Sequence, residues 1–466
     1  MNIYIKVEIK SRELESRLLL ALVAAERGHS VLIGPQKQTI GATVNGILKP
    51  GIVHDKSLSP GPGKIEAMKR STQAGCIYTS QDEESGLLDE DYSDFAKSRF
   101  SEETLRMVHR VFAWGEHDRS GVIAMYPTAK SKIVATGNPR VDLWRADLSE
   151  YFKEQKYGEL SNYIMIPSNF GGPLANRRMW QRLSFERSSG YYQRGVGEFR
   201  QYDLEAYSIG LLMFFVKSIR GIAAAFPDTN IVVRPHPIES EEAWLGHLGE
   251  IPNVRVNMSG SAGSWIRNAS VIVHNGCTTG LEAAVCGKPV IAYRPLKSEF
   301  EWEIPNQVSY QVENESELLD VIGFVLRTKH LPAEMDLDGI QELFNRRFAN
   351  LQGRLAGDRI VDEWEKLDNG RLSMPNRWSK IKVGEIYRSA KGTIGAIKRL
   401  ATLDYGTASR KLSYKFPPIG HSEIMGIVSR FRFALKRFDN IKVRLLDERL
   451  ILVEPRSKAA VRKSCE

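Results

Sequence analysis

The sequence of 466 residues is poor in cysteine and has no long apolar run. Its four cysteines show neither metal-ligand spacing nor a disulfide framework, so we expect reduced thiols in a cytoplasmic protein. No apolar stretch approaches the roughly 20 residues of a membrane-spanning helix, and we expect no signal peptide. These absences argue against a secreted disulfide-rich protein and against an integral membrane protein.

The motifs of several common nucleotide-binding enzymes are also absent. There is no glycine-rich dinucleotide fingerprint and no P-loop lysine, which argues against NAD-dependent enzymes and NTPases. Two acidic strings, at 89–91 and 336–338, follow no expected strand, so we assign no metal and no cofactor. Basic residues are not interleaved with enough aromatic ones to form a stacking platform, so we expect no nucleic-acid partner.

The composition that remains is that of a soluble globular protein, with 42% apolar and 26% charged residues. The length predicts two or three domains. The net charge of +9 is uneven, because residues 371–466 contain 22 lysines and arginines against 8 aspartates and glutamates. That balance of +14 leaves −5 for residues 1–370, so the tail is expected to meet an anionic membrane surface or a polyanion.

Strands and helices alternate through most of the chain. A strand at 3–9, an amphipathic helix at 13–27 and a strand at 30–33 open a doubly wound fold. After a polar linker at 149–161 a second alternating unit begins. Further strands are expected at 75–79, 111–115, 132–136, 163–167, 230–234 and 253–256, and a long helix at 203–226.

We therefore expect an α/β protein with two Rossmann-like domains and a cleft between them. The boundaries predicted from the sequence are residues 1–155 and 156–370, followed by a basic, partly helical extension at 371–466. Ligand sites are expected at the carboxyl ends of the strands.

The segment 271–295 indicates one such site. A β-branched strand at 271–273 runs into a turn, and a helix then starts at Thr278-Thr279, before a second strand at 290–293. The first turn of a helix presents free backbone N–H groups and the positive end of the helix dipole. The turn with Asn275 and the two threonine hydroxyls therefore predict a phosphate site.

A second site residue is expected at the end of the strand 230–234. Arg234 and His236 belong to the string Arg-Pro-His-Pro, in which the prolines restrict the positions of the imidazole. Alone, His236 is more often a hydrogen-bonded turn residue, and Thr278-Thr279 a plain helix cap. Together they describe a clamp for a nucleotide phosphate, with Glu282 either accepting from a ribose hydroxyl or capping its own helix.

The basic tail contains one amphipathic helix, expected at 422–438. Such a helix either lies on an anionic membrane or packs its apolar face back on the body of the protein. The sequence leaves both open.

Several short motifs within residues 1–365 occur in the order seen in bacterial surface-carbohydrate biosynthesis proteins. The chain resembles GT-B glycosyltransferases of the group that includes the CMP-Kdo-dependent β-Kdo transferases. More distantly it is similar to capsule Kdo transferases, bacterial sialyltransferases and teichoic acid glycerophosphotransferases. The motifs are Glu8 with Arg12-Glu13-Leu14, Asp82-Glu83-Glu84 with Gly86, Trp114-Gly115, Gly137-Asn138-Pro139-Arg140, Ser168-Asn169-Phe170, Arg234-Pro235-His236-Pro237, and His274-Asn275 with Thr278-Thr279-Gly280-Leu281-Glu282-Ala283.

This resemblance implies roles for individual residues. His236 and Thr278-Thr279 would hold the phosphate of a CMP-linked donor. Asp203 would be the nucleophile of a retaining transferase, trapping an oxocarbenium-like donor, or else an acid in the first turn of its helix. Glu84 would deprotonate the acceptor hydroxyl, or else belong to a solvated acidic loop.

Four further residues are candidates for the site. Glu8 and Arg12 would face the acceptor, although charges so early in a helix are usually solvated or paired. Ser168 and Asn169 would contact donor or acceptor. The resemblance thus implies a metal-independent GT-B glycosyltransferase that moves Kdo or another ulosonic acid onto a surface polysaccharide or lipid-linked glycan. We expect it in the cytoplasm, peripheral to the inner membrane through the tail helix.

Three alternatives stay open at this point: a CDP-polyol phosphotransferase, a UDP-sugar epimerase-like GT-B enzyme, and a non-catalytic nucleotide-binding protein.

Overall fold

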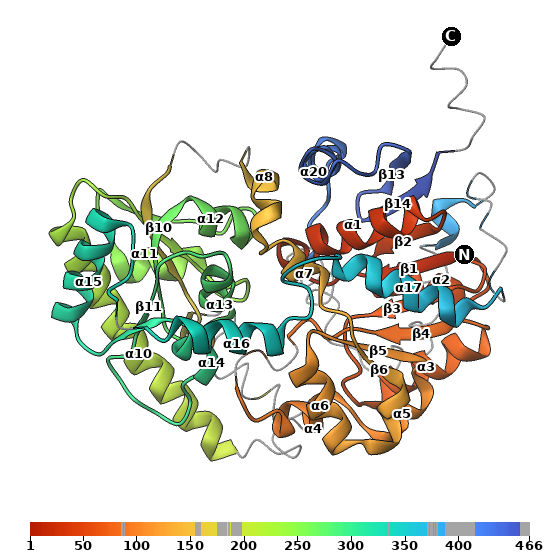
Figure 1. Ribbon diagram of the computed structural model, residues 1–466, viewed down its shortest axis with the longest axis horizontal. Helices are drawn as coiled ribbons and strands as arrows, with labels where there is room; N and C mark the ends of the chain where they lie inside the picture. The colour runs from red at the N-terminus through yellow and green to blue at the C-terminus, as the bar shows by residue number, and fades with distance from the viewer. Residues whose placement is uncertain are drawn as a thin grey trace, which may run out of the picture. The chain divides into compact units, whose positions relative to one another are not determined.

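The computed structural model has two compact units, each with its own sheet (Figure 1). The first unit comprises Met1–Gly86, Asp91–Tyr151 and Glu342–Glu466, and the second comprises Leu87–Glu90 and Phe152–Gln341. The residues described are 1–84, 87, 89–153, 160–174, 184, 187, 198–333, 335–370, 372, 376, 378, 381–386 and 415–456.

The expected α/β class with two Rossmann-like domains is confirmed, because the sheet of each unit consists mainly of parallel strands that lie between helices. The elements of the first unit are β1 Asn2–Lys6, α1 Lys10–Glu26, β2 Ser30–Gly34, α2 Gln36–Val44, β3 Ile52–Asp55, α3 Pro62–Gln73, β4 Ile77–Ser80, α4 Ser93–Arg99, α5 Glu102–Met107, β5 Arg110–Ala113, α6 Glu116–Met125, η1 Pro127–Lys132, β6 Ile133–Ala135, α7 Pro139–Asp142, η2 Ala146–Leu148, α17 Ala356–Asp368, α20 His421–Leu435, β13 Ile441–Asp447 and β14 Leu450–Pro455.

The elements of the second unit are β7 Tyr163–Pro167, η3 Gly172–Leu174, α10 Glu198–Ala225, β8 Ile231–Arg234, α11 Glu241–Leu248, β9 Val254–Val256, α12 Ala262–Asn268, β10 Ala269–His274, α13 Thr278–Val285, β11 Val290–Tyr293, α14 Glu303–Gln307, β12 Tyr310–Val312 and α15 Glu315–Thr328. Helices α8 Ser149–Phe152 and α16 Leu337–Arg347 run across the unit boundaries.

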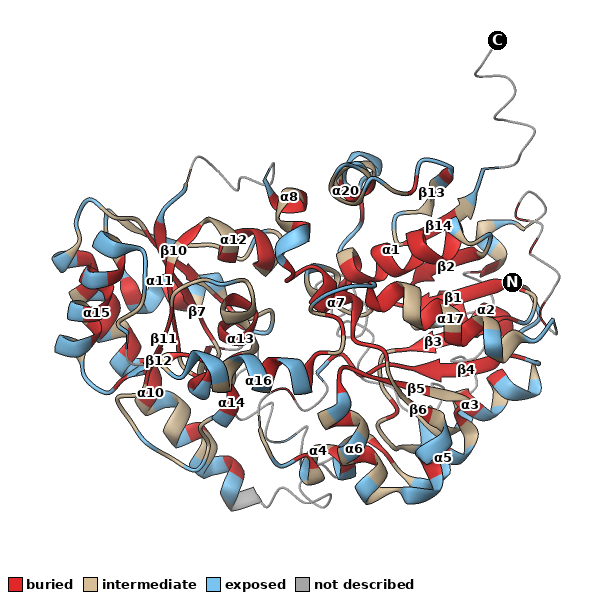
Figure 2. Cartoon of the chain, in the orientation of Figure 1, coloured by how far each residue is buried: buried red, intermediate tan, exposed pale blue. Residues whose placement is uncertain are grey.

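The first sheet has eight strands in the order β13-β14-β2-β1-β3-β4-β5-β6. The strands from β2 to β6 are parallel, and β14 joins β2 antiparallel, with Leu452 opposite Leu32. Ile3, Tyr4 and Ile5 of the central strand β1 are fully buried, as expected for a strand covered on both faces. Figure 2 shows this buried layer in red.

Both faces of the first sheet carry helices. Tyr4, Val53 and Tyr78 point into the core formed with α2 to α6. On the opposite face α1 and α17 pack against each other, and Trp364 of α17 lies edge-on to His54 with ring centroids 5.2 Å apart.

The second sheet has six parallel strands in the order β12-β11-β10-β7-β8-β9. One face packs on α10, α11 and α15, with Phe215 and Trp244 among the fully buried side chains. The other face packs on α12 and α13 through Trp265 and Ala283. Every strand from β7 to β11 except β9 is therefore an almost continuous apolar run.

The compact units begin and end at other residues than the domains expected from the sequence, whose boundaries are 155/156 and 370/371. Residues from Glu342 onward belong to the first unit, and so do the described elements of the expected extension at 371–466. The reason is pairing and packing: β14 continues the first sheet beside β2, and α17 lies along α1.

The tail helix α20 packs its apolar face on the first unit. Ile424, Ile427, Val428 and Phe431 are buried, and the Phe431 ring stacks on Tyr151 with centroids 4.3 Å apart. The sequence left open whether this apolar face lies on a membrane or packs on the protein, and in the structure it packs on the protein. The apolar face of α20 is therefore not available to a membrane.

One sequence expectation needs correction: a helix of membrane-spanning length and apolarity does exist among the described residues. Arg200–Ala225 of α10 passes that test by length and composition, with a mean hydropathy of 1.5 over 18 residues. No membrane is part of the structure, and 39% of that stretch is buried in the protein. Its inner face, with Leu212, Phe215 and Ile219, belongs to the core of the second unit.

Candidate functional site

The strand order of the second sheet brings three of the sequence motifs to one edge. β7 is flanked by β8 and β10, and the chain order reverses between β7 and β10. Pro167 lies opposite Arg234, and Met165 lies opposite Ile272, so the three strands end level with one another. Parallel α/β sheets bind ligands at the carboxyl edge where the strand order reverses.

The loops after β7 and β10 are joined by two asparagines. Asn169 donates through Nδ2 to the carbonyl of Gly276, and Asn275 donates through Nδ2 to the carbonyl of Asn169, both at 3.4 Å. The expected site residues Asn169 and Asn275 are thus neighbours, with Ser168 buried beside them.

A buried carboxylate that the sequence did not single out holds the loops after β7 and β8. Glu239 is fully buried and accepts from the backbone N–H groups of Phe170 at 2.8 Å and Gly171 at 3.0 Å. It also accepts from the N–H of His236 at 3.2 Å and from the Ser168 hydroxyl. One side chain therefore fixes both loops, which lie on adjacent strands.

His236 has a defined tautomer in this arrangement. Its Nδ1 accepts from the backbone N–H of Ile238 at 3.3 Å, which leaves the ring proton on Nε2. The side chain is half-buried. Nε2 is therefore a hydrogen-bond donor of the kind that a phosphate oxygen accepts.

Arg234 braces the neighbouring loop after β9. Its guanidinium donates to the carbonyls of Ser259 at 2.9 Å and Gly260 at 2.5 Å, and lies 5.8 Å from the ring centroid of Trp265. Its predicted contact with phosphate stays a prediction, and would need these carbonyl bonds to be exchanged or shared.

The turn after β10 is shaped by His274. Burial lowers the pKa of His274 to about 3, so the ring is neutral. Its Nδ1 accepts from the backbone N–H of Gly276 at 2.8 Å, and its Nε2 bonds to Ser309 Oγ at 2.9 Å. A Cβ on Gly280 would meet this imidazole at 2.7 Å, so only glycine lets α13 begin so close to the ring.

The two threonines are the first residues of α13, and both are half-buried. The N-cap is Cys277, so neither threonine is a plain cap. Burial raises the pKa of the Cys277 thiol to about 11, and this neutral thiol interacts with the amide and hydroxyl of Thr279. A thiol is a weak acceptor, so the helix end keeps its attraction for an anion.

The two carboxylates expected at the donor site, Glu282 and Asp203, lie on different helices. Glu282 is buried on α13, and its Oε1 would be 3.6 Å from a Cβ on Gly263 of α12. Asp203 lies five residues inside α10, which begins at Glu198, and its side chain is exposed. The buried carboxylate of that turn is Glu205, which accepts from Gln201 Nε2 at 3.0 Å.

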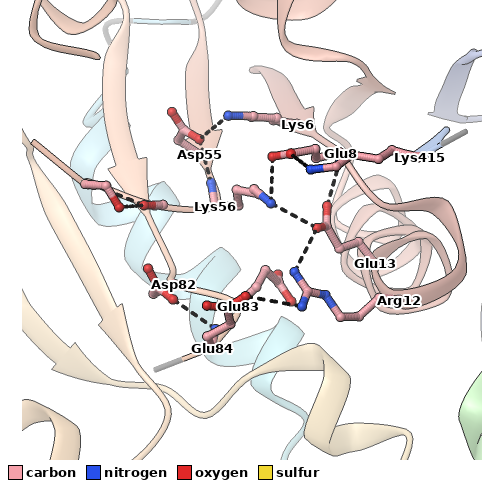
Figure 3. A network of polar contacts seen from close by, with 12 residues as sticks. Lys6, Glu8, Arg12, Glu13, Asp55, Lys56, Asp82, Glu83, Glu84 and Lys415 are labelled. Carbon is pink, nitrogen blue, oxygen red and sulfur yellow. Dashed lines mark hydrogen bonds and ion pairs between the residues drawn. The ribbon is translucent and has the colours of Figure 1, made fainter. Parts of the chain in front are cut away.

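The first unit has a second cluster of polar residues at its own reversal of strand order, between β1 and β3 (Figure 3). Lys56 bonds Glu8 at 2.8 Å and Glu13 at 3.3 Å. Lys415, from the tail, bonds Glu8 at 2.7 Å. Burial alone would raise the pKa of Glu8, but the charges of Lys56 and Lys415 outweigh it and lower the pKa to about 2.

The two glutamates of the acidic motif after β4, Glu83 and Glu84, lie in different environments. Glu83 is buried and paired with Arg17, and burial raises its pKa. Glu84 is partly exposed and pairs with Arg12, at 3.3 Å, and with Arg99. Burial acts to raise the pKa of Glu84, but the charges of Arg99 and Arg12 outweigh it and lower the pKa. A carboxylate with a lowered pKa is a weaker general base.

Other motifs of the resemblance have structural roles in the first unit. A Cβ on Gly115 would meet the backbone of Arg347 at 2.4 Å, and a Cβ on Gly137 would meet Asn350 at 2.2 Å. The Trp114 indole donates to the carbonyl of Asp82 at 2.7 Å. These glycines leave room for Arg347, at the end of α16, and for Asn350 to lie against the turns after β5 and β6. Gly86 of the acidic motif lies outside the described residues.

No protein-family model matches the sequence, and no curated protein matches it. Among solved structures, the UDP-GlcNAc 2-epimerase of Methanocaldococcus jannaschii is 15% identical over 78% of this chain and 100% of its own, with a TM-score of 0.46. The UDP-GlcNAc 2-epimerase of Neisseria meningitidis, bound to UDP-GlcNAc, is 14% identical over 79% of this chain and 100% of its own, with a TM-score of 0.45.

The wall teichoic acid polymerase TagF is 9% identical over 72% of this chain and 95% of its own, with a TM-score of 0.41.

Proposed function

We propose that the chain is a GT-B enzyme that binds a nucleotide-activated sugar or polyol through its second unit and breaks a bond at the nucleotide phosphate. The observation that carries the proposal is the level ending of β7, β8 and β10, which gathers an imidazole donor and an anion-attracting helix end at one edge. β8 and β10 are two strands apart, roughly 10 Å, a span that a phosphate or diphosphate group bridges.

In this proposal each group has one task. His236 donates from Nε2 to a phosphate oxygen, while Thr278 and Thr279 offer hydroxyls and the positive end of α13. Both contacts stabilise the negative charge that remains on the phosphate when the bond breaks. No metal is required for that stabilisation.

The proposal extends to the chemical class of the donor. A retaining transfer of a CMP-linked ulosonic acid needs a carboxylate nucleophile, and the outward, exposed position of Asp203 does not support that role. A UDP-sugar epimerase-like reaction or the transfer of a CDP-linked polyol phosphate needs no nucleophile on α10. We therefore rank these two reactions above the CMP-Kdo reaction. In a transfer from CMP-Kdo or from a CDP-linked polyol phosphate, the acceptor is a surface glycan or glycolipid.

One experiment separates the classes. Purified protein is incubated with CMP-Kdo, CDP-glycerol and UDP-GlcNAc, and products are followed by NMR. We expect either a new epimer of UDP-GlcNAc or release of CMP from CDP-glycerol, with water taking up the glycerol phosphate when no acceptor is present. Turnover of CMP-Kdo alone would restore the Kdo assignment, and nucleotide binding without turnover of any donor would favour a binding protein.

The same assay tests the site. His236→Asn removes the proposed Nε2 donor and is expected to weaken nucleotide binding about tenfold, the worth of one charge-assisted hydrogen bond. His247→Asn, on the exposed end of α11, is the matched control and should leave binding unchanged. Equal affinities for both variants would contradict the phosphate role of His236.

A further inference from the structure

Helix α10 presents an apolar face to solvent in the second unit. Ten large apolar side chains are exposed among the described residues, and four of them are on this one helix. Tyr202, Ile209, Met213 and Phe214 are 41%, 43%, 46% and 41% exposed. An apolar cluster of this kind on a single element marks an interaction surface rather than scattered surface residues.

The spacing of these residues makes one continuous outer face. Tyr202, Ile209 and Met213 follow one another at intervals of seven and four residues, which places them along one side of an α-helix. Ala206 and Ala224 are exposed on the same side. The inner side carries Leu212 and Phe215 in the core, so α10 is anchored as part of the fold of the second unit.

The charges on this outer face are mainly basic. From Ala206 to Ala224 its charged residues are Lys217 and Arg220, and Arg200 and Asp203 lie near the start of the helix. Lys217 pairs with Glu315 at 3.6 Å and Arg200 with Glu299 at 3.4 Å, with 77% and 60% of the two basic side chains exposed. Such exposed pairs contribute little, so the cations can exchange these partners for others.

We propose that the outer face of α10 docks, lying flat, on an anionic lipid surface. Apolar side chains flanked by basic ones are what an interfacial helix requires: Ile209, Met213 and Phe214 enter the boundary of the acyl chains, and Lys217 meets lipid phosphates. The tail helix α20 does not serve this purpose, because its apolar face is buried in the first unit. The inference does not depend on the proposed enzymatic function.

The test is co-sedimentation of the full chain with phosphatidylcholine vesicles, with and without phosphatidylglycerol. We expect binding to the mixed vesicles, weakened at least about tenfold by the double variant Ile209→Glu/Met213→Glu, since each substitution puts a charge where an exposed apolar group would enter the lipid. Lys217→Glu should weaken binding about fivefold on the anionic vesicles alone.

A matched double variant, Leu245→Glu/Leu337→Glu, changes exposed apolar residues elsewhere in the second unit and should bind like the wild-type chain. Melting temperatures of all variants, measured without vesicles, control for folding. Equal binding by the two double variants, or equal binding to vesicles with and without phosphatidylglycerol, would overturn the proposal. So would a wild-type dimer that the α10 variant dissociates and that ignores vesicles, because the face would then join two copies.

Discussion

At the scale of single residues, the arrangement of the second unit depends on close contacts that tolerate no added atom. At the proposed phosphate site the closest such contact is between Gly280 and His274, where the first turn of α13 packs against a neutral imidazole. The glycine is required by space, since no positive φ is involved.

Gly280→Ala is expected to destabilise the second unit by about 1–3 kcal/mol, the usual cost of overpacking a core position. It should also shift the start of α13 and weaken nucleotide binding. Chemical denaturation and a nucleotide titration measure the two effects. Gly246→Ala is the matched control in helix α11, where nothing lies within 4 Å of the added carbon, and it should be neutral or stabilising by up to about 1 kcal/mol.

A second prediction at this scale concerns the effect of Glu239 on stability and on nucleotide binding. Glu239→Gln keeps the shape but places an amide among five donors, so we expect a loss of about 2 kcal/mol or more. Nucleotide affinity should fall with it, because the loops after β7 and β8 lose their common acceptor. Glu242→Gln, on the exposed surface of α11, should change neither quantity. Unchanged stability in Glu239→Gln would show that the carboxylate does not hold the loops.

The sequence could not have identified Glu239. It stands in a string of acids that resembles any solvated helix start, and its partners Phe170 and Gly171 are 69 and 68 residues away. His236 and Thr278-Thr279 were accessible to sequence reasoning because short motifs at strand ends mark them. Asp203 was misplaced at a helix start, since α10 begins five residues earlier.

At the scale of elements, apolar periodicity predicted strands that are buried on both faces, and β11 at 290–293 has the predicted bounds. It did not predict the hairpin of β13 and β14. The turn between them, Glu448-Arg449, lacks the glycine or asparagine that marks a tight hairpin, although β13 shows the alternation of apolar and charged residues that is typical of a half-buried strand. The pairing of β14 with β2, which is more than 400 residues away in the chain, has no local signal.

The tail helix α20 carries a clear prediction because it has one buried and one exposed phenylalanine. Phe431→Ala should destabilise the first unit by about 3–5 kcal/mol, since the ring is buried against Tyr151. Phe433→Ala, at a position 58% exposed, should change stability by no more than about 0.5 kcal/mol. Denaturant unfolding of both variants measures this. Equal effects would mean that α20 is not docked on the first unit.

At the scale of the whole molecule, each unit contains a buried neutral histidine at the end of a central strand. Burial and the charge of Arg17 lower the pKa of His54 well below its usual value, and burial lowers the pKa of His274 to about 3. In the unfolded chain both would titrate near pH 6.5. Their contribution to stability is therefore complete above pH 6.5 and is lost as the pH falls toward the folded pKa values.

We expect each of the two histidines to lower the free energy of unfolding between pH 7 and pH 5, by at most about 1.4 kcal/mol per pH unit, whereas Asp142, whose pKa burial raises to about 7, acts in the opposite direction over the same range. Denaturant titrations at several pH values measure this slope. His54→Gln and His274→Gln should each flatten it, whereas His421→Gln, at an exposed position, should not. Identical slopes in all four proteins would contradict the assignment of acid sensitivity to the two buried rings.

The antiparallel joining of β14 to β2 also bears on how the protein is made. Because the last described strand covers an edge laid down near the beginning, the first sheet cannot close during synthesis until residues 450–455 have left the ribosome. The second unit is nearly continuous in the chain and meets no such delay. The sheet and helices of the second unit can assemble while the edge of β2 is still unpaired. That unpaired edge makes β2 the place where a nascent chain is most exposed to aggregation or to chaperone capture.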